Sequence, residues 1–125
     1  MRPERQKTVM IVEDNKIHMN LMKDILHPAG YATVGTYEGR KAVSLARKHR
    51  PDLILMDIQL GDISGLEVTK KLKKDKTLKD IPIIAVTAFA MNGDEKMCFS
   101  AGCTAYIHKP ISVTVLMNMI GRLIG

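Results

Sequence analysis

The chain has 125 residues, of which 46% are apolar, and this length and composition predict one ordinary globular domain over residues 1–125, with its core at about 8–124. The only two cysteines, Cys98 and Cys103, fit no usual zinc spacing, and we expect reduced thiols in a cytoplasmic protein. The longest nearly apolar run, residues 83–91, is far shorter than the roughly 20 residues that a membrane helix needs. We therefore expect no membrane span, and the polar start of the chain predicts no signal peptide.

The net charge of +6 leaves open an anionic partner such as nucleic acid. Two basic segments, residues 47–50 and 70–79, supply much of this charge. Acidic Asp75 and Asp80 lie among the lysines of the second segment, and no aromatic residues are available there to stack on bases. This pattern favours a solvated surface, with a basic nucleic-acid-binding module as the alternative.

The first half of the chain alternates between apolar runs and helical patterns. Strands are predicted at 8–12, 31–36 and 53–56, since short runs rich in β-branched residues are typical of buried strands. A first helix, capped by Asp14 or Asn15, is expected to end at residues 27–28 and to place Ile17, Leu21 and Ile25 on its inner side. A second helix is predicted over 38–49.

The second half continues the alternation. Ser64 and Glu67 form a capping-box pattern that predicts a third helix reaching about residue 74. Strands are expected at 82–86 and 105–107, with a fourth helix over about 94–100 that ends at Gly102. Ser112 should cap a last helix, whose inner stripe is predicted to be Val113, Leu116, Ile120 and Leu123.

Strand–helix alternation of this kind predicts an α/β fold with a parallel sheet covered by helices on both faces. For this length the natural arrangement is a flavodoxin-like, doubly wound sheet of five strands in the order 2-1-3-4-5, with five helices. The methionines at 19, 22, 117 and 119 are then expected to fill the core between the first and last helices, with a docking patch for a helical partner as the alternative.

Charged residues follow three of the predicted strands. Glu13 and Asp14 follow the first, Asp57 follows the third, and Lys109 follows the fifth. Because the carboxyl ends of parallel strands share one edge of a sheet, we expect these side chains to meet there. Carboxylates held so close repel one another, so the sequence predicts a site for a divalent cation. Thr87 follows the fourth strand, where its hydroxyl could donate a hydrogen bond to a phosphoryl oxygen.

These motifs resemble those of the receiver domain of two-component response regulators, in the same order and at the same spacing over nearly the whole chain. They resemble most a branch of stand-alone receivers that control cell division and polarity. The residues that carry the resemblance are 11–15, 55–60, 63–70, 86–91 and 106–112.

The resemblance implies a phosphoacceptor role for Asp57 and a Mg²⁺ site, with Mn²⁺ as a substitute. Asp14, Asp57 and the backbone carbonyl of Gln59 would hold the metal, while Glu13 would act largely through water. Lys109 would pair with the phosphoryl group. The protein would catalyse its own phosphorylation and slow dephosphorylation, and would not be an enzyme for other substrates.

The resemblance also implies a switch and a set of partners. Thr87 would sense the phosphoryl group through its hydroxyl, Tyr106 would turn inward behind it, and Lys109-Pro110 would be a cis peptide. Gln59 and Phe89 would tune hydrolysis of the acyl phosphate, and residues 91–93 are a candidate moving segment. The implied partners are a sensor histidine kinase or histidine phosphotransfer protein and a downstream protein effector. No membrane partner is expected.

Two other interpretations are weaker. A haloacid-dehalogenase-type phosphohydrolase needs a second acid two residues after the nucleophile, where this chain has Gln59. A flavodoxin needs a first loop that accepts phosphate, and Glu13-Asp14 would repel one.

The four histidines, 18, 27, 49 and 108, are interpreted as ordinary surface or packing residues. Many receivers have proline where this chain has Gly61, which leaves the stiffness of the loop after Asp57 open.

Overall fold

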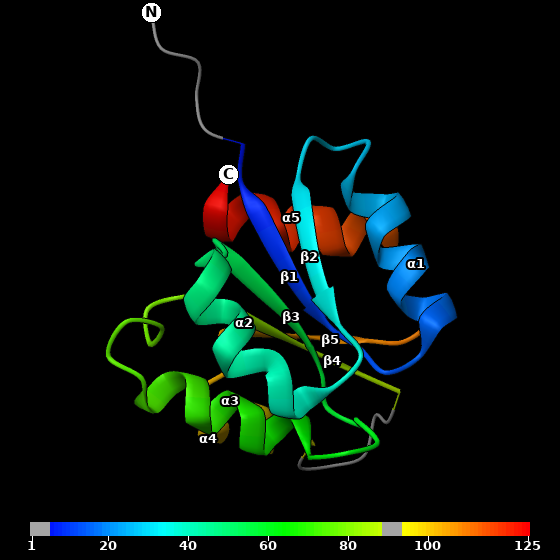
Figure 1. The fold of residues 1–125 in the computed structure, drawn as a ribbon. Coiled ribbons are helices and arrows are strands. Elements are labelled where there is room, and N and C mark those ends of the chain that lie inside the picture. Colours follow the sequence, from blue (N-terminus) through cyan, green and yellow to red (C-terminus); the bar gives the residue numbers. More distant parts are fainter. Residues whose placement is uncertain (1–5, 89–93) are drawn as a thin grey trace, which may run out of the picture.

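A computed structural model describes residues 6–88 and 94–125. Five parallel strands form one sheet in the order β2-β1-β3-β4-β5, which confirms the predicted topology (Figure 1). The elements are β1 (Thr8–Val12), α1 (Lys16–Leu26), β2 (Ala32–Thr36), a 3₁₀ turn (Gly39–Lys41), α2 (Ala42–His49), β3 (Leu53–Asp57), α3 (Gly65–Lys74), β4 (Ile83–Thr87), α4 (Asp94–Ala101), β5 (Ala105–His108) and α5 (Val113–Ile124). Phe89 and residues 91–93, expected to tune hydrolysis and to move, lie outside the described residues.

Helices cover both faces of the sheet, as the alternating pattern predicts. Helices α1 and α5 pack on one face, where alternate strand residues such as Ile11 and Leu55 contact Met19 and Leu116. Helices α2, α3 and α4 pack on the other face against residues such as Met10 and Met56. Because every residue of β3 and β4 is buried, these two strands are the centre of the core.

The inner face of α1 differs from the prediction. Met19, Met22 and Leu26 are buried, whereas Ile17 is 76% exposed and Leu21 is 48% exposed. The helix carries two apolar stripes that both have helical spacing, so periodicity alone could not say which one faces the sheet. The core interpretation of Met19 and Met22 is confirmed, and a docking role for the Met19 side chain is excluded by its burial.

Helix α5 departs from the prediction at one position. Leu116 and Ile120 are fully buried and Leu123 packs against them, but Val113 is 52% exposed. Val113 is the first residue of the helix, directly after its cap Ser112, and therefore lies beyond the part of the helix that the sheet covers.

The helix ends follow the local sequence closely. The Ser64 hydroxyl caps α3 by accepting from the Leu66 amide at 3.2 Å, while Glu67 pairs with Lys70 rather than completing the predicted capping box. The helix predicted over 38–49 begins as a 3₁₀ turn and continues as α2, ending at Arg50 in a left-handed conformation.

Helix α4 ends in a Schellman motif. The amides of Gly102 and Cys103 donate to the carbonyls of Phe99 and Cys98, and Gly102 has φ +115°. This motif brings the two cysteines together in the core, where both are buried and form no disulfide. The predicted end of the helix at Gly102 is confirmed.

Candidate functional site

The carboxyl ends of four neighbouring strands meet at one edge of the sheet. Val12 pairs with Met56, Asp57 with Val86, and Thr87 with His108 in the parallel register. The strands run one residue further than predicted, so Asp57 and Thr87 are themselves the last residues of β3 and β4. This register brings residues at the carboxyl ends of β1, β3, β4 and β5 into one site.

Three carboxylates lie together at this edge. Oxygen atoms of Glu13, Asp14 and Asp57 all lie within 4.8 Å of one another, as the strand order predicts. Glu13 is fully buried, Asp57 is 4% exposed, and Asp14 is exposed to solvent. The cluster therefore has two acids in the protein interior and a third at its mouth.

The Lys109 ammonium partly balances the two buried acids. Its Nζ atom lies 2.7 Å from Glu13 Oε1 and 3.3 Å from Asp57 Oδ2, and its side chain is 16% exposed. The Lys109-Pro110 peptide bond is cis, as the resemblance implies. One ammonium thus faces two buried carboxylates and a third acid close by.

This imbalance shifts the pKa values of the two buried acids in opposite directions. Burial and a hydrogen bond with Glu13 raise the pKa of Asp57 well above its usual range. Burial also opposes ionisation of Glu13, but hydrogen bonds with Asp57, Lys109 and the Asn15 amide outweigh it and lower the pKa of Glu13. Asp57 is therefore the acid that most needs additional positive charge.

Backbone amides fix the orientation of the carboxylates. The Asn15 amide donates to Glu13 Oε2 at 3.1 Å, and the Gln59 amide donates to Asp57 Oδ1 at 2.9 Å. Gly65 contributes through its lack of a side chain, since a Cβ atom there would lie 2.1 Å from the Asp57 carbonyl oxygen. The start of α3 therefore packs directly against the strand end that carries Asp57.

The loop between β3 and α3 is held at its far side by Asp62. Its two carboxylate oxygens accept hydrogen bonds from the amides of Gly39 and Arg40, each at 3.0 Å. These amides open the 3₁₀ turn before α2, where a negative charge is favourable. Gly61 lies at the mouth of the site, and a Cβ atom there would come within 3.3 Å of Asp14 Oδ2. The loop is thus anchored next to Gly61.

The donor set fits a magnesium ion. Mg²⁺ binds hard oxygen ligands, usually one or two carboxylates with water completing its shell. The exposed Asp14 and the buried Asp57 supply such oxygens on the open side of the cluster, and a cation there would stabilise the charge of Asp57, whose pKa is raised chiefly by burial. The side chain of Gln59 is exposed beside them, and the role of its carbonyl stays a prediction.

The two predicted switch residues lie on neighbouring strands. Thr87 is buried, at 3% exposure, at the end of β4. Tyr106 is half-buried on β5, and its hydroxyl lies 3.4 Å from His108 Nδ1, with the two rings packed edge to face. Any inward turn of Tyr106 would therefore have to break its contact with His108, and the switch itself stays a prediction.

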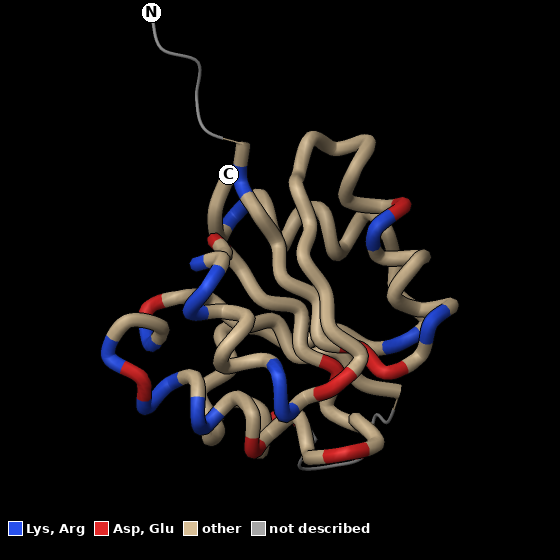
Figure 2. Tube along the Cα trace, viewed as in Figure 1, with Lys and Arg blue, Asp and Glu red and all other residues tan. Residues whose placement is uncertain are grey.

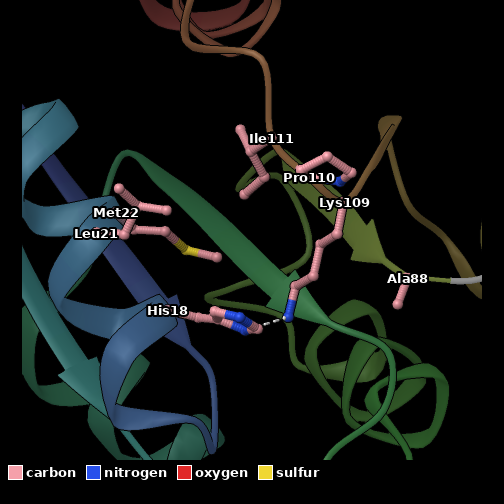
Figure 3. A pocket seen from close by; sticks show the side chains of 7 residues that line it. All are labelled: His18, Leu21, Met22, Ala88, Lys109, Pro110 and Ile111. Carbon is pink, nitrogen blue, oxygen red and sulfur yellow. Dashed lines mark hydrogen bonds between the residues drawn. The ribbon is translucent and has the colours of Figure 1, made fainter.

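His18 belongs to the site, although no sequence pattern distinguishes it from the other histidines. Its Nδ1 atom lies 3.1 Å from Lys109 Nζ and 3.6 Å from Glu13 Oε1 (Figure 3). By contrast, His27 contacts Thr33, away from this edge. Only the position of His18 in the first turn of α1, just after the acidic pair, could have indicated its role.

A cavity of about 410 Å³ opens beside Lys109. It lies between α1 and the segment that follows β5, and its wall is largely apolar (Figure 3). The lining residues are His18, Leu21, Met22, Ala88, Lys109, Pro110 and Ile111. The cavity therefore adjoins the site at His18 and Lys109.

The lysine-rich surface lies away from this edge, over α2, α3 and the segment after α3 (Figure 2). Several of its cations have partners within the protein. Arg47 pairs with Asp75 at 2.7 Å, and the Lys73 ammonium donates to the carbonyls of Lys79 and Ile81. These contacts give the basic residues structural roles, in keeping with the solvated-surface interpretation.

Among the residues that the structure describes, no helix is long and apolar enough to cross a membrane.

Comparisons with known proteins find similar sequences over nearly the whole chain. The polar-differentiation response regulator DivK of Brucella anthropi is 57% identical over 119 residues, which cover 95% of this chain and 97% of that protein. The DivK protein of Brucella ovis is 56% identical over the same length.

Solved structures that share this fold include a receiver domain and a response regulator. The receiver domain of a sensor histidine kinase from Pseudomonas aeruginosa is 32% identical, with a TM-score of 0.89 over 97% of this chain and 99% of that one, and its structure has a magnesium ion coordinated in the active-site cleft. A response regulator structure from Chloroflexus aurantiacus has a TM-score of 0.91 at 25% identity, over 95% of this chain and 98% of that one. The family description "Response regulator receiver domain" matches residues 9–121, and the chain belongs to this family.

Proposed function

We propose that this protein is a single-domain response regulator of a two-component phosphorelay. It accepts a phosphoryl group from a phosphohistidine on Asp57 and then changes its binding to kinase or effector partners. The observation that carries the proposal is the buried Asp57 carboxylate, which lies between a second acid and the Lys109 ammonium at the sheet edge. Similarity to the Brucella polar-differentiation regulators supports a role in cell-division and polarity control.

Four groups hold Mg²⁺ in this proposal. Asp14, Asp57 and the Gln59 backbone carbonyl are direct ligands, and Glu13 acts through water because Lys109 already occupies it. Bound Mg²⁺, or Mn²⁺ in its place, supplies positive charge that offsets the charge of the carboxylates and phosphoryl oxygens.

The residues of the site then have distinct roles in phosphoryl transfer. A carboxylate oxygen of Asp57 attacks phosphorus, the new P–O bond forms, and the P–N bond breaks with its electron pair remaining on the donor imidazole. The Lys109 ammonium pairs with the phosphoryl oxygens, and the Thr87 hydroxyl donates a hydrogen bond to one of them. Hydrolysis of the resulting acyl phosphate by water returns Asp57 to its carboxylate form. The protein is therefore the substrate of its own slow chemistry and not an enzyme for other substrates.

Movements of Thr87 and Tyr106 convert the bound phosphoryl group into a change at the protein surface. Movement of Thr87 toward the new oxygens opens space behind it, and Tyr106 leaves His108 to fill that space. This change alters the surface formed by α4 and β5, which an effector protein reads.

The phosphodonor reaches Asp57 over the cavity between α1 and the segment after β5. Ile17 and Leu21 are exposed on α1 beside this cavity, and apolar side chains left in water next to a reaction site favour contact with a protein partner. A histidine kinase or histidine phosphotransfer protein would fit this position. The proposal places the protein in the cytoplasm, where the thiols of Cys98 and Cys103 would stay reduced.

Incubation with acetyl phosphate and MgCl₂, followed by intact-mass measurement, tests the proposal. One phosphoryl group should be added, it should be removed by hydroxylamine as an acyl phosphate would be, and EDTA should prevent its addition. Asp57→Asn should abolish uptake. Asp24→Asn is a matched control, because Asp24 is an exposed acid on α1 away from the site.

Phosphate uptake by the Asp57→Asn protein, or none by the wild type, would contradict the proposal. Salt-sensitive binding of nucleic acid without any phosphate uptake would instead favour the basic binding module.

A further inference from the structure

The Lys109 ammonium already uses all three of its N–H donors. Its acceptors are Glu13 Oε1 at 2.7 Å, His18 Nδ1 at 3.1 Å and Asp57 Oδ2 at 3.3 Å. A protonated lysine has three donors and no acceptor. Any phosphoryl oxygen that Lys109 binds must therefore displace one of these three partners.

The three partners are not equally easy to displace. Glu13 and Asp57 are buried, and displacing either would leave a buried carboxylate oxygen without this donor, which costs the full desolvation of that oxygen. Because the ammonium can only donate, His18 Nδ1 is the acceptor in the third hydrogen bond. The His18 ring is partly exposed, so on displacement it can exchange this bond for one to water.

The position of His18 supports the same order. Its side chain is 43% exposed, whereas those of Glu13 and Asp57 are 0% and 5% exposed. His18 and Lys109 both line the cavity, and a hydrogen bond joins them (Figure 3). An anion in this cavity would lie next to that bond.

We infer that His18 is a placeholder for the incoming phosphoryl group: it occupies the cavity-facing donor of Lys109 and is displaced when a phosphoryl oxygen binds. The inference rests on the proposed function, because it assigns a further residue to the same reaction. His18 is a positioning residue in this scheme, since it acts through Lys109 and forms no bond to phosphorus. Its hydrogen bond opposes donor binding and so limits how readily the resting protein is phosphorylated.

Initial rates of phosphorylation at varied acetyl phosphate, at fixed Mg²⁺ and fixed pH, test the inference. His18→Ala removes the competing acceptor, so the rate at low acetyl phosphate should rise roughly two- to tenfold, which is the net effect of one hydrogen bond. The rise should come from a lower half-saturating concentration, with the maximal rate unchanged. His18→Asn keeps an acceptor at the place of Nδ1 and should restore rates near those of the wild type.

Asn20→Ala is the matched control, because Asn20 is exposed on the same helix and does not line the cavity. Thermal unfolding of each variant shows that the fold is kept. Nitrogen NMR of the His18 ring adds a direct readout: the Nδ1 signal should be that of a hydrogen-bonded acceptor at rest and should change when beryllofluoride and Mg²⁺ are added.

An unchanged or slower rate for His18→Ala would overturn the inference, as would a His18 signal that does not respond to beryllofluoride. A failure of wild-type protein to take up any phosphate would be a different result, since it would reject the proposed function itself.

Discussion

Glu13 and Asp57 lie together at one buried edge of the sheet, yet their pKa values shift in opposite directions. Lys109 lies closer to Glu13, at 2.7 Å, than to Asp57, at 3.3 Å. The ammonium therefore stabilises the charge on Glu13 and leaves Asp57 only partly compensated. Burial of this reactive carboxylate should lower the free energy of unfolding of the resting protein, and the effect should be measurable.

Asp57→Asn should stabilise the metal-free protein at neutral pH. A raised pKa means that folded Asp57 holds its proton more tightly than the unfolded chain does, so stability falls as pH rises from about 4 through the raised pKa. The variant has no carboxylate at this position and escapes that loss. We expect its melting temperature in EDTA to exceed that of the wild type by roughly 3 °C or more at pH 8, and the difference to vanish near pH 3. Equal melting temperatures at pH 8 would show that burial of Asp57 costs nothing.

Magnesium should raise the melting temperature of the wild type above that of Asp57→Asn. A ligand that binds only the folded state stabilises it in proportion to the logarithm of its concentration over Kd. The melting temperature of the wild type should therefore rise with MgCl₂, while those of Asp14→Asn and Asp57→Asn should rise much less. Asp24→Asn should respond as the wild type does. A similar response in all four proteins would place the ion elsewhere.

Much of the fold could be predicted because strong local signals agreed with one another. Apolar runs marked β1, β3 and β4, and Ser64, Gly102 and Ser112 marked helix ends through hydrogen bonds that these residues make locally. The edge that gathers the acids followed from strand order alone, since parallel strands end on the same side.

Contacts between distant segments could not be predicted in this way. The pairing of His18 with Lys109 joins residues 91 positions apart and depends on how the segment after β5 crosses α1. The choice between the two apolar stripes of α1 likewise depends on its rotation against the sheet, which Met19 and Met22 determine by packing. Spacing along a helix defines possible faces, but tertiary packing selects one of them.

The two cysteines should be unreactive in the folded protein. Burial, together with the neighbouring Cys98 thiol, raises the pKa of Cys103 to about 11, and the thiolate is the reactive form. Iodoacetamide at pH 8 should therefore modify neither residue appreciably in hours, although both should react within minutes in guanidinium chloride. Mass spectrometry would count the additions, with glutathione as a control for reagent activity. Rapid labelling of the native protein would mean that the end of α4 opens readily.

Thr87→Ala should separate phosphorylation from its readout. The hydroxyl is not required for attack by Asp57, so uptake from acetyl phosphate should remain largely intact. The variant lacks the hydroxyl that donates to the phosphoryl oxygen. Its phosphorylation-dependent gain in partner binding should therefore fall several-fold, which corresponds to the free energy of about one hydrogen bond. Thr87→Ser, which keeps the hydroxyl, should retain the response. Equal binding of partner by phosphorylated wild type and Thr87→Ala would remove Thr87 from the switch.

A crystal structure of the protein grown with beryllofluoride and Mg²⁺ is the most direct test of the central claim that Asp57 is a metal-assisted phosphoacceptor. The account predicts beryllofluoride on an Asp57 carboxylate oxygen, Lys109 and Thr87 in contact with its fluorine atoms, and Mg²⁺ bound by Asp14, Asp57 and the Gln59 carbonyl. A structure in which Asp57 carries no beryllofluoride and the metal lies away from the three acids would contradict it.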